Sequence, residues 1–514
     1  MIIGVLKEAQ PGETRVSATP NTVAQLVKLG YVVVVAAGAG TLASFPDEAY
    51  AEAGASIGDP LGADIVFGVN APSTAQLDGL RDGATVIAWL SPMLDAALVE
   101  DLSRRNITAL ALDAVPRISR AQSMDVLSST ANIAGYRAVV EAAHEFGRFF
   151  TGQVTAAGKV PPAKVLVAGA GVAGLAAIGA AGSLGAIVYA TDPRPEVADQ
   201  VKSLGGEYLD VDTGEEQEVS ATGYAKEMGQ NYNELAAQLY ARTVPDVDIL
   251  ITTANIPGRP APKLISAEMV ASMKPGSVIV DMAAATGGNV AGTVKGQRTL
   301  TDNGVIILGY TDLAGRLPTQ ASQLFGQNLV NLMKLLTPEK DGQLVLDWDD
   351  VIQRSITVVR NGELAWPPPP VQVSAAPATP AGGSVPTAGT AAPPPEKVPM
   401  PPQRRYGLIG AAFLVFFLIA AFAPAAILPQ LIVLALAIVI GYYVIGNVHH
   451  ALHTPLMSVT NAISGIIVVG GILELGHYST LVTLISGAAV LLASINIFGG
   501  FAVTRRMLAM FQRS

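Results

Sequence analysis

The feature that most constrains this chain is a long stretch without charge near its C-terminus. From residue 406 to residue 473 there is no Asp, Glu, Lys or Arg, and after Glu474 the next charged residue is Arg505. The polar surface of a soluble domain cannot be built from such a stretch, whereas an apolar helix of about 20 residues crosses a bilayer. The chain before about residue 365 has an ordinary globular composition. We therefore expect a soluble part followed by a membrane part.

The membrane part is expected to contain four spans. Segments of suitable length lie at 407–425, 428–447, 455–475 and 480–503. Pro424 and Pro429 mark a turn between the first two segments. Arg404 and Arg405 precede the first span and Arg505 follows the last, which places both ends in the cytosol by the positive-inside rule.

In the soluble part, short apolar runs alternate with helical patterns such as 20–30. A first series of runs lies at 31–38, 63–69, 84–90 and 107–113, and a second at 164–169, 186–192, 247–254, 277–283 and 305–310. This alternation favours an α/β fold with parallel sheets that are buried on both faces. We expect two doubly wound, Rossmann-like subdomains with a cleft between them, formed by 1–138 plus about 310–365 and by 139–309. A Pro/Ala-rich linker at 366–403 then leads to the membrane domain at 404–514.

Composition excludes several classes of function. A net charge of -9 argues against nucleic acid as a partner. The absence of cysteine excludes disulfides, thiolate metal sites and cysteine nucleophiles, and we expect no metal site. The opening residues, MIIGVLKEAQPGETRV, lack the long apolar core of a signal peptide. We therefore expect the soluble part to stay in the cytosol.

A candidate dinucleotide site opens the second series of strands. Gly169, Gly171 and Gly174 form the pattern G-x-G-x-x-G after an apolar run, with Ala170 inside the loop and a helical pattern from Val172. The first glycine permits a tight turn, the second lets the backbone approach a pyrophosphate, and the third lets the helix pack on the strand. A glycine-rich turn that binds nothing is the alternative.

An acidic residue at the end of the next strand indicates which nucleotide is bound. Asp192 follows Gly174 by 18 residues, and its carboxylate would accept hydrogen bonds from both ribose hydroxyls and repel a 2′-phosphate. Arg194, after Pro193, would favour binding of the 2′-phosphate of NADP(H), but we give Asp192 more weight. We expect NAD(H) rather than NADP(H).

The soluble part offers few groups for acid–base catalysis. A dehydrogenase that oxidises an alcohol or amine generally needs a base, most often histidine. His144 is the only histidine of this part, and its helical setting favours a structural role, although lysine or tyrosine could still serve. Hydride exchange between two nicotinamide rings moves no proton and requires only approach, orientation and exclusion of water. The scarcity of acid–base groups in the soluble part is what hydride exchange between two nicotinamide rings predicts.

Several blocks of the sequence resemble those of a known family. The blocks at 7–20, 116–139, 223–228, 252–262 and 309–322, with the glycine loop, resemble the α subunit of the bacterial proton-translocating NAD(P) transhydrogenases. The resemblance covers the whole chain. It implies that NAD(H) binds here, that a separate β subunit carries further spans and the NADP(H) site, and that hydride transfer from NADH to NADP⁺ is coupled to inward proton movement. It also implies an α₂β₂ assembly with paired NAD domains, spanning the bacterial inner membrane several times.

The resemblance assigns roles within the segment RISRAQSMDVLSS at 117–129. It implies that Gln122 brings the two nicotinamide rings together, that Arg117 and Asp125 form an ion pair that orients the ring carboxamide, and that Ser128 is a further contact. Further cofactor contacts are implied for Arg120 and Ala121 in this segment, for Gly223 and Tyr224 in a mobile loop that closes over nucleotide, and for Asn255, which stands where the family has an apolar residue.

Two other classes of function remain open. Alanine dehydrogenases share the opening block, but they have a substrate-binding lysine and a catalytic histidine, and this chain has Asn70, Trp89 and Leu90 in the corresponding regions. The second alternative is a non-catalytic NAD sensor that gates a transporter. Only the specific sequence of the segment at 116–139 argues against it. Within the membrane part, the candidates for a proton path are His449, His450, His453, Glu474, His477, Asn461, Ser464 and Asn496. We expect these to be scaffold, with the main relay in the β subunit.

Overall fold

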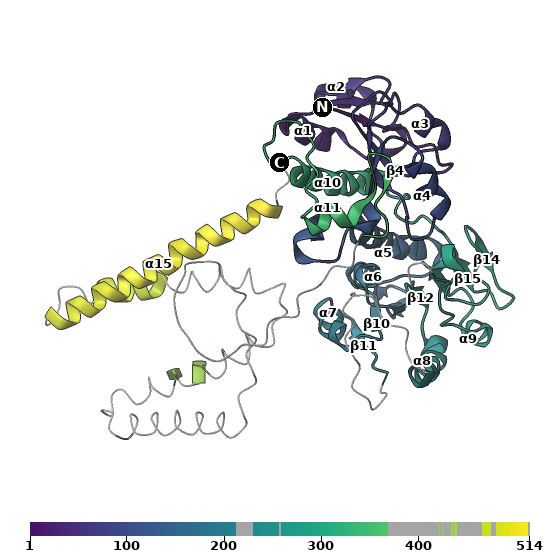
Figure 1. The fold of residues 1–514 in the computed structure, drawn as a ribbon. Coiled ribbons are helices and arrows are strands. Elements are labelled where there is room, and N and C mark those ends of the chain that lie inside the picture. Colours follow the sequence, from purple (N-terminus) through teal and green to yellow (C-terminus); the bar gives the residue numbers. More distant parts are fainter. Residues whose placement is uncertain are drawn as a thin grey trace, which may run out of the picture. The chain divides into compact units, whose positions relative to one another are not determined.

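The computed structural model describes residues 1–211, 230–255, 259–368, 465–473 and 480–511, with a few isolated residues between 421 and 441. The chain divides into two units, Met1–Ala378 and Thr379–Ser514. The first unit holds all the sheets of the described residues (Figure 1).

One sheet of the first unit has eight strands in the order β17-β16-β6-β5-β4-β1-β2-β3. The parallel strands are β1 (Ile2–Val5), β2 (Val32–Val35), β3 (Ser56–Ile57), β4 (Ile65–Asn70), β5 (Thr85–Trp89) and β6 (Thr108–Ala111). Helices of this part are α1 (Pro20–Lys28), α2 (Asp47–Glu52), α3 (Thr74–Asp78), α4 (Ala96–Ser103), α10 (Pro318–Leu336) and α11 (Val351–Ile356). The strand order reverses between β1 and β4, so their carboxyl ends form a switch point of the kind where ligands bind.

The second sheet has seven strands in the order β11-β10-β9-β12-β13-β15-β14. Its strands are β9 (Lys164–Ala168), β10 (Ile187–Thr191), β11 (Glu207–Tyr208), β12 (Ile249–Thr252), β13 (Val278–Asp281), β14 (Arg298–Leu300) and β15 (Ile306–Leu308). Its helices are α6 (Val172–Ser183), α7 (Ala198–Ser203), α8 (Gln230–Thr243) and α9 (Ala267–Ser272). Here the order reverses between β9 and β12, directly beside the glycine loop.

The predicted α/β class and the nine predicted apolar runs are confirmed, but the sheets are not purely parallel. β14 pairs antiparallel with β15, and β16 (Thr357–Arg360) pairs antiparallel with β6 and with β17 (Glu363–Leu364). Only two residues, Asn361 and Gly362, join β16 to β17, and both have positive φ. A connection this short can form only a hairpin, so this edge of the sheet must be antiparallel.

A 20-residue helix, α5 (Val126–Glu145), lies where the two sheets meet and contacts both α6 and α10 (Figure 1). A Cβ on Gly135 of α5 would lie only 2.0 Å from the carbonyl oxygen of Ala173, at the start of α6. The glycine therefore lets two helix backbones touch. A short hairpin, β7 (Gln153–Thr155) and β8 (Gly158–Val160), follows α5.

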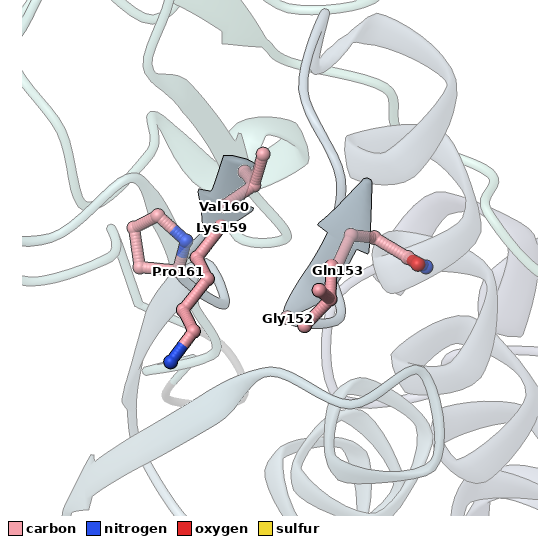
Figure 2. Close-up of a pocket in the computed structure, with 6 residues that line it drawn as sticks. Gly152, Gln153, Lys159, Val160 and Pro161 are labelled. Atoms are coloured by element: carbon pink, nitrogen blue, oxygen red, sulfur yellow. The ribbon is translucent and has the colours of Figure 1, made fainter. Parts of the chain in front are cut away.

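A pocket borders this hairpin, as Figure 2 shows. It is lined by Gly152, Gln153, Val154, Lys159, Val160 and Pro161. The lining contains no carboxylate, histidine or hydroxyl group, and Lys159 is its only side chain that can ionise.

In the second unit, the described residues form a helical segment at 465–473 and the helix α15 (Thr480–Phe511), which contains the predicted segment 480–503. Across the described ranges, no helix is both long and apolar enough to cross a membrane. Of the predicted segment 455–475, only residues 465–473 are described. Most of the segments at 407–425 and 428–447, the linker beyond residue 368 and the polar membrane candidates other than Asn496 lie outside the described residues.

Candidate dinucleotide-binding site

The glycine loop joins β9 to α6, and its first and third glycines are required by the protein's own packing. Gly169 has φ +104°, and a Cβ there would lie 2.4 Å from the Thr253 hydroxyl oxygen. A Cβ on Gly174 would lie 1.9 Å from the carbonyl oxygen of Gly169. Larger residues at either position would displace the loop from the end of β12.

The second glycine is left open toward the solvent side of the loop. Gly171 precedes the first turn of α6, where no side chain of the described residues caps the helix. A Cβ on Gly171 would have an Arg194 guanidinium nitrogen as its nearest neighbour, at 3.7 Å. The absence of a side chain is therefore not needed for packing, and it leaves the N–H groups of α6 accessible to an anionic ligand. The cradle fits a pyrophosphate.

Asp192, directly after β10, is only 7% exposed and hydrogen-bonds the backbone of the glycine loop. Its Oδ2 accepts a hydrogen bond from the Ala170 N–H at 2.8 Å, and its Oδ1 accepts from the Arg194 backbone N–H and Nε at 2.9 and 2.8 Å. A second guanidinium nitrogen of Arg194 donates to Oδ2 at 3.1 Å. A carboxylate has about four lone-pair sites. Ribose hydroxyls could therefore reach Asp192 only if Arg194 moves aside.

Tyr208 on β11 completes this corner of the sheet. Its hydroxyl donates a hydrogen bond to the Asp192 carbonyl oxygen at 2.6 Å. Burial, together with the charge of Asp192, raises the pKa of Tyr208 to about 12. The phenol stays protonated at neutral pH, so it acts as a donor and not as a general base.

The segment assigned to the nicotinamide rings forms a 3₁₀ helix, Ser119–Met124, ahead of α5. Ala121 and Met124, three residues apart, share one face of such a helix and are 0% and 4% exposed in the core of the first sheet. Arg120 and Gln122 are exposed. We call residues 117–125 the ring loop, and its burial pattern presents the Gln122 side chain to the outside.

Asp125 ends the ring loop and caps α5. Its carboxylate accepts hydrogen bonds from the Ser128 N–H at 2.9 Å and from the Ser128 hydroxyl at 2.6 Å. The structure thus brings Asp125 and Ser128 together, whereas the ion pair of Arg117 with Asp125 stays a prediction. From Asp125, about 15 Å of helix leads to Gly135, which touches the start of α6. One helix therefore links the ring loop to the glycine loop.

The remaining predicted residues either make no hydrogen bond to the glycine loop or the ring loop within the described part of the chain, or lie outside it. Pro193 is half-buried, and Asn255 is exposed and accepts a hydrogen bond from the Thr286 hydroxyl at 3.0 Å. Gly223 and Tyr224 lie outside the described residues. His144 is exposed in the last turn of α5, about 28 Å along the helix from Asp125, so it is no base for this site.

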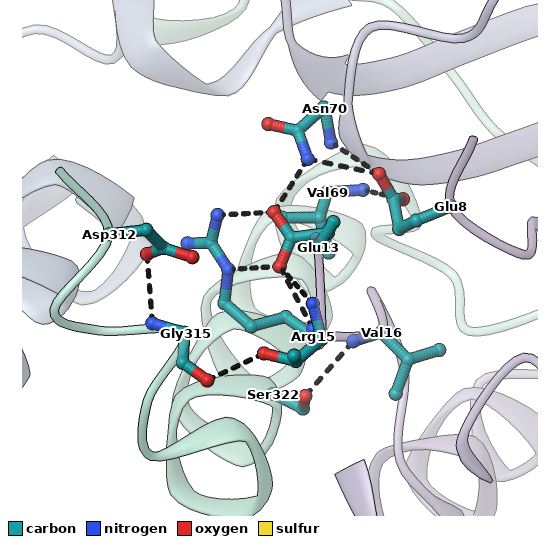
Figure 3. A network of polar contacts seen from close by, with 10 residues as sticks. Glu8, Glu13, Arg15, Val16, Val69, Asn70, Asp312, Gly315 and Ser322 are labelled. Atoms are coloured by element: carbon teal, nitrogen blue, oxygen red, sulfur yellow. Dashed lines mark hydrogen bonds and ion pairs between the residues drawn. The ribbon is translucent and has the colours of Figure 1, made fainter. Parts of the chain in front are cut away.

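A polar cluster that the sequence did not single out lies at the switch point of the first sheet (Figure 3). Glu13 accepts hydrogen bonds from Arg15 Nε at 2.8 Å and from a second guanidinium nitrogen at 2.7 Å. Asn70 Nδ2 donates to Glu13 at 2.8 Å and to Glu8 at 3.1 Å. Val69 N–H donates to Glu8 at 2.7 Å. The sequence drew attention to the opening block and to Asn70 through the comparison with alanine dehydrogenases, but it did not indicate that their side chains meet.

The electrostatics of the cluster separate its two acids. Burial raises the pKa of Glu8 above its ordinary value. Burial would also raise the pKa of Glu13, but the hydrogen bonds and charge of Arg15 hold it below the ordinary value. Asn70 is thus a bridge between carboxylates, while Leu90 is 1% exposed and Trp89 half-buried.

The described residues contain no group of three or more acidic or histidine side chains that could hold a metal. The candidate site consists of the glycine loop, the buried Asp192 carboxylate and the exposed ring loop.

The sequence matches two family models over most of the first unit. They are "Alanine dehydrogenase/PNT, N-terminal domain" over residues 4–134 and "Alanine dehydrogenase/PNT, C-terminal domain" over residues 138–367. The fold and the glycine loop define a nicotinamide-dinucleotide-binding protein of this two-domain class. Residues 430–513 match the "4TM region of pyridine nucleotide transhydrogenase, mitoch".

Similar proteins narrow this class. The NAD(P) transhydrogenase subunit alpha of Haemophilus influenzae is 55% identical, and that of Cereibacter sphaeroides 48%, each over 100% of both chains. A crystal structure of transhydrogenase from Sinorhizobium meliloti is 42% identical, with a TM-score of 0.65, and covers 71% of this chain and 100% of that one. The chain belongs to the family of NAD(P) transhydrogenase alpha subunits.

Proposed function

We propose that this chain binds NAD(H) at the glycine loop and exchanges hydride directly with NADP(H) held by a partner β subunit. The nicotinamide ring supplies the hydride, and the protein supplies approach, orientation and exclusion of water. The observation that carries the proposal is the ring loop, in which Ala121 and Met124 are buried while Gln122 is exposed beside the capped start of α5. Such a loop can present one carboxamide to a ring carried by another molecule.

The individual residues would divide the work as follows. Gly171 admits the pyrophosphate to the N-terminus of α6, and Asp192 receives the ribose once Arg194 releases it. Asp125, with Ser128, fixes the first turn of α5 and so the end of the ring loop. None of these groups needs to take a proton, in keeping with the raised pKa of Tyr208.

The wider assembly belongs to the same proposal. The subdomains at 1–138 with 310–365 and at 139–309 would enclose the nucleotide in a cleft, and the linker at 366–403 would join them to four spans in a bacterial inner membrane. Two such chains and two β subunits would form the enzyme, with both chain ends in the cytosol. Because hydride exchange between NADH and NADP⁺ is nearly balanced, inward proton movement would act through the affinities for nucleotide.

Binding and exchange can be tested in sequence. Calorimetric titration of residues 1–378 with NADH and NADPH should show a clear preference for NADH. Addition of an NADP(H)-binding β domain should then start hydride transfer to an NAD analogue, followed by absorbance. NADH binding without exchange, when the β domain is shown to bind its own nucleotide, would favour a nucleotide sensor and refute the proposal.

A further inference from the structure

The ring loop is held from a distant part of the chain by two carboxamides on α10. Nδ2 of Asn328 and Nδ2 of Asn331 both donate to the carbonyl oxygen of Ser123, each at 2.9 Å. Ser123 is the neighbour of Gln122 and stands near the end of the 3₁₀ helix, where carbonyl groups lack partners within the helix. Two donors more than 200 residues away in sequence therefore converge on one atom of the ring loop.

The Ser123 carbonyl oxygen does not need two side-chain donors to satisfy its hydrogen-bonding capacity. Ser123 is exposed, so water could hydrogen-bond its carbonyl without help from either asparagine. Asn328 is 6% exposed and lies one helical turn from the buried side chains of Phe325 and Leu332 on α10. Its Oδ1 is buried and has no hydrogen-bonding partner among the described residues. An unsatisfied buried acceptor is costly, so an apolar residue would serve the core better here.

Asn331 adds a second, independently held donor. It is one helical turn after Asn328, where residues three apart lie on the same face. Its Oδ1 accepts hydrogen bonds from Gln327 Nε2 at 3.3 Å and Lys334 Nζ at 3.4 Å, which orient the amide with Nδ2 toward Ser123. The two carboxamides fix one backbone atom in two directions.

We propose that Asn328 and Asn331 are positioning residues for hydride transfer, which set the orientation of Gln122 by fixing the Ser123 carbonyl. They touch neither nucleotide; they act through the ring loop. Their loss should leave NAD(H) binding intact and slow the exchange, because a displacement of about 1 Å in a reacting geometry can cost as much as a hundredfold in rate. This inference rests on the proposed function.

The test uses the full-length chain with its β subunit and compares wild type with Asn331→Asp. The substitution removes the donor at constant size, and the nearby Lys334 ammonium balances the new charge. Asn106→Asp, on an exposed turn before β6, adds the same charge elsewhere as a control. We expect kcat for hydride exchange to fall at least about tenfold in Asn331→Asp. The Kd for NADH should change less than about twofold, and the control should match wild type.

A double substitution shows whether Asn331 acts through Gln122. In a Gln122→Ala background, Asn331→Asp should have almost no further effect, because residues that act as a unit are non-additive. Additive losses, a fall in kcat smaller than about threefold, or NADH binding that is lost together with exchange would each overturn the inference. Failure of wild type to exchange hydride would instead overturn the proposed function.

Discussion

Replacement of Gly135 by alanine should displace the glycine loop, because Gly135 of α5 contacts the start of α6. The new Cβ would lie 2.0 Å from the carbonyl oxygen of Ala173, where an ordinary contact begins at 3.4 Å. The start of α6 must therefore move away from α5 by about 1.4 Å to relieve the overlap. Because both contacting groups are helix backbone, no side-chain rotation can absorb the change. The glycine loop, which is continuous with α6, has to move with it.

The expected cost follows from the size of the overlap. Overpacking by one methyl group typically lowers the free energy of unfolding by about 1–3 kcal/mol. If about 1.4 kcal/mol of favourable loop contacts is lost in the nucleotide complex, the Kd for NADH rises about tenfold. Urea unfolding of residues 1–378, followed by circular dichroism, measures the first quantity, and calorimetric titration with NADH measures the second.

A matched substitution controls for the change from glycine to alanine. Gly179 lies inside α6, and a Cβ there would meet only the Leu204 side chain, at an ordinary 3.8 Å. Gly179→Ala should stabilise the helix by up to about 1 kcal/mol and leave NADH binding unchanged. If Gly135→Ala behaves like Gly179→Ala, the contact between α5 and α6 does not position the loop and the reasoning fails.

Three further substitutions test other parts of the site. Asp192→Asn should weaken NADH binding about tenfold or more and narrow the preference over NADPH, as measured by calorimetry; an unchanged preference would contradict the role of Asp192. Asp125→Ala removes the cap of α5 and should lower the free energy of unfolding by about 1 kcal/mol; equal urea midpoints would refute this. Glu13→Gln should cost about 3–5 kcal/mol near neutral pH, because the Arg15 guanidinium is left buried without its partner. The folded pKa of Glu13 is lowered, so its contribution is present above about pH 4.5 and is lost as the pH falls through the folded pKa; a difference between wild type and variant that does not shrink in acid would contradict this assignment.

Local patterns in the sequence were sufficient for nine buried strands and for the nucleotide loop, but not for short or antiparallel strands such as β3, β14 and β16. Buried parallel strands are continuous apolar runs, so the strands of both series could be recognised one by one. The first and third glycines of the loop follow from backbone sterics, and the structure shows the contacts, at Thr253 and at the Gly169 carbonyl, that require them.

What the tertiary structure decided depends on contacts between distant residues. No local pattern indicated that Asn328 and Asn331 would reach back to Ser123. The sequence by itself thus determined the class of fold, the position of the glycine loop and the family, because these depend on short-range periodicity and motif. The pairing of polar side chains from distant parts of the chain was decided only by folding, because a hydrogen bond has no sequence signature when its two partners are hundreds of residues apart.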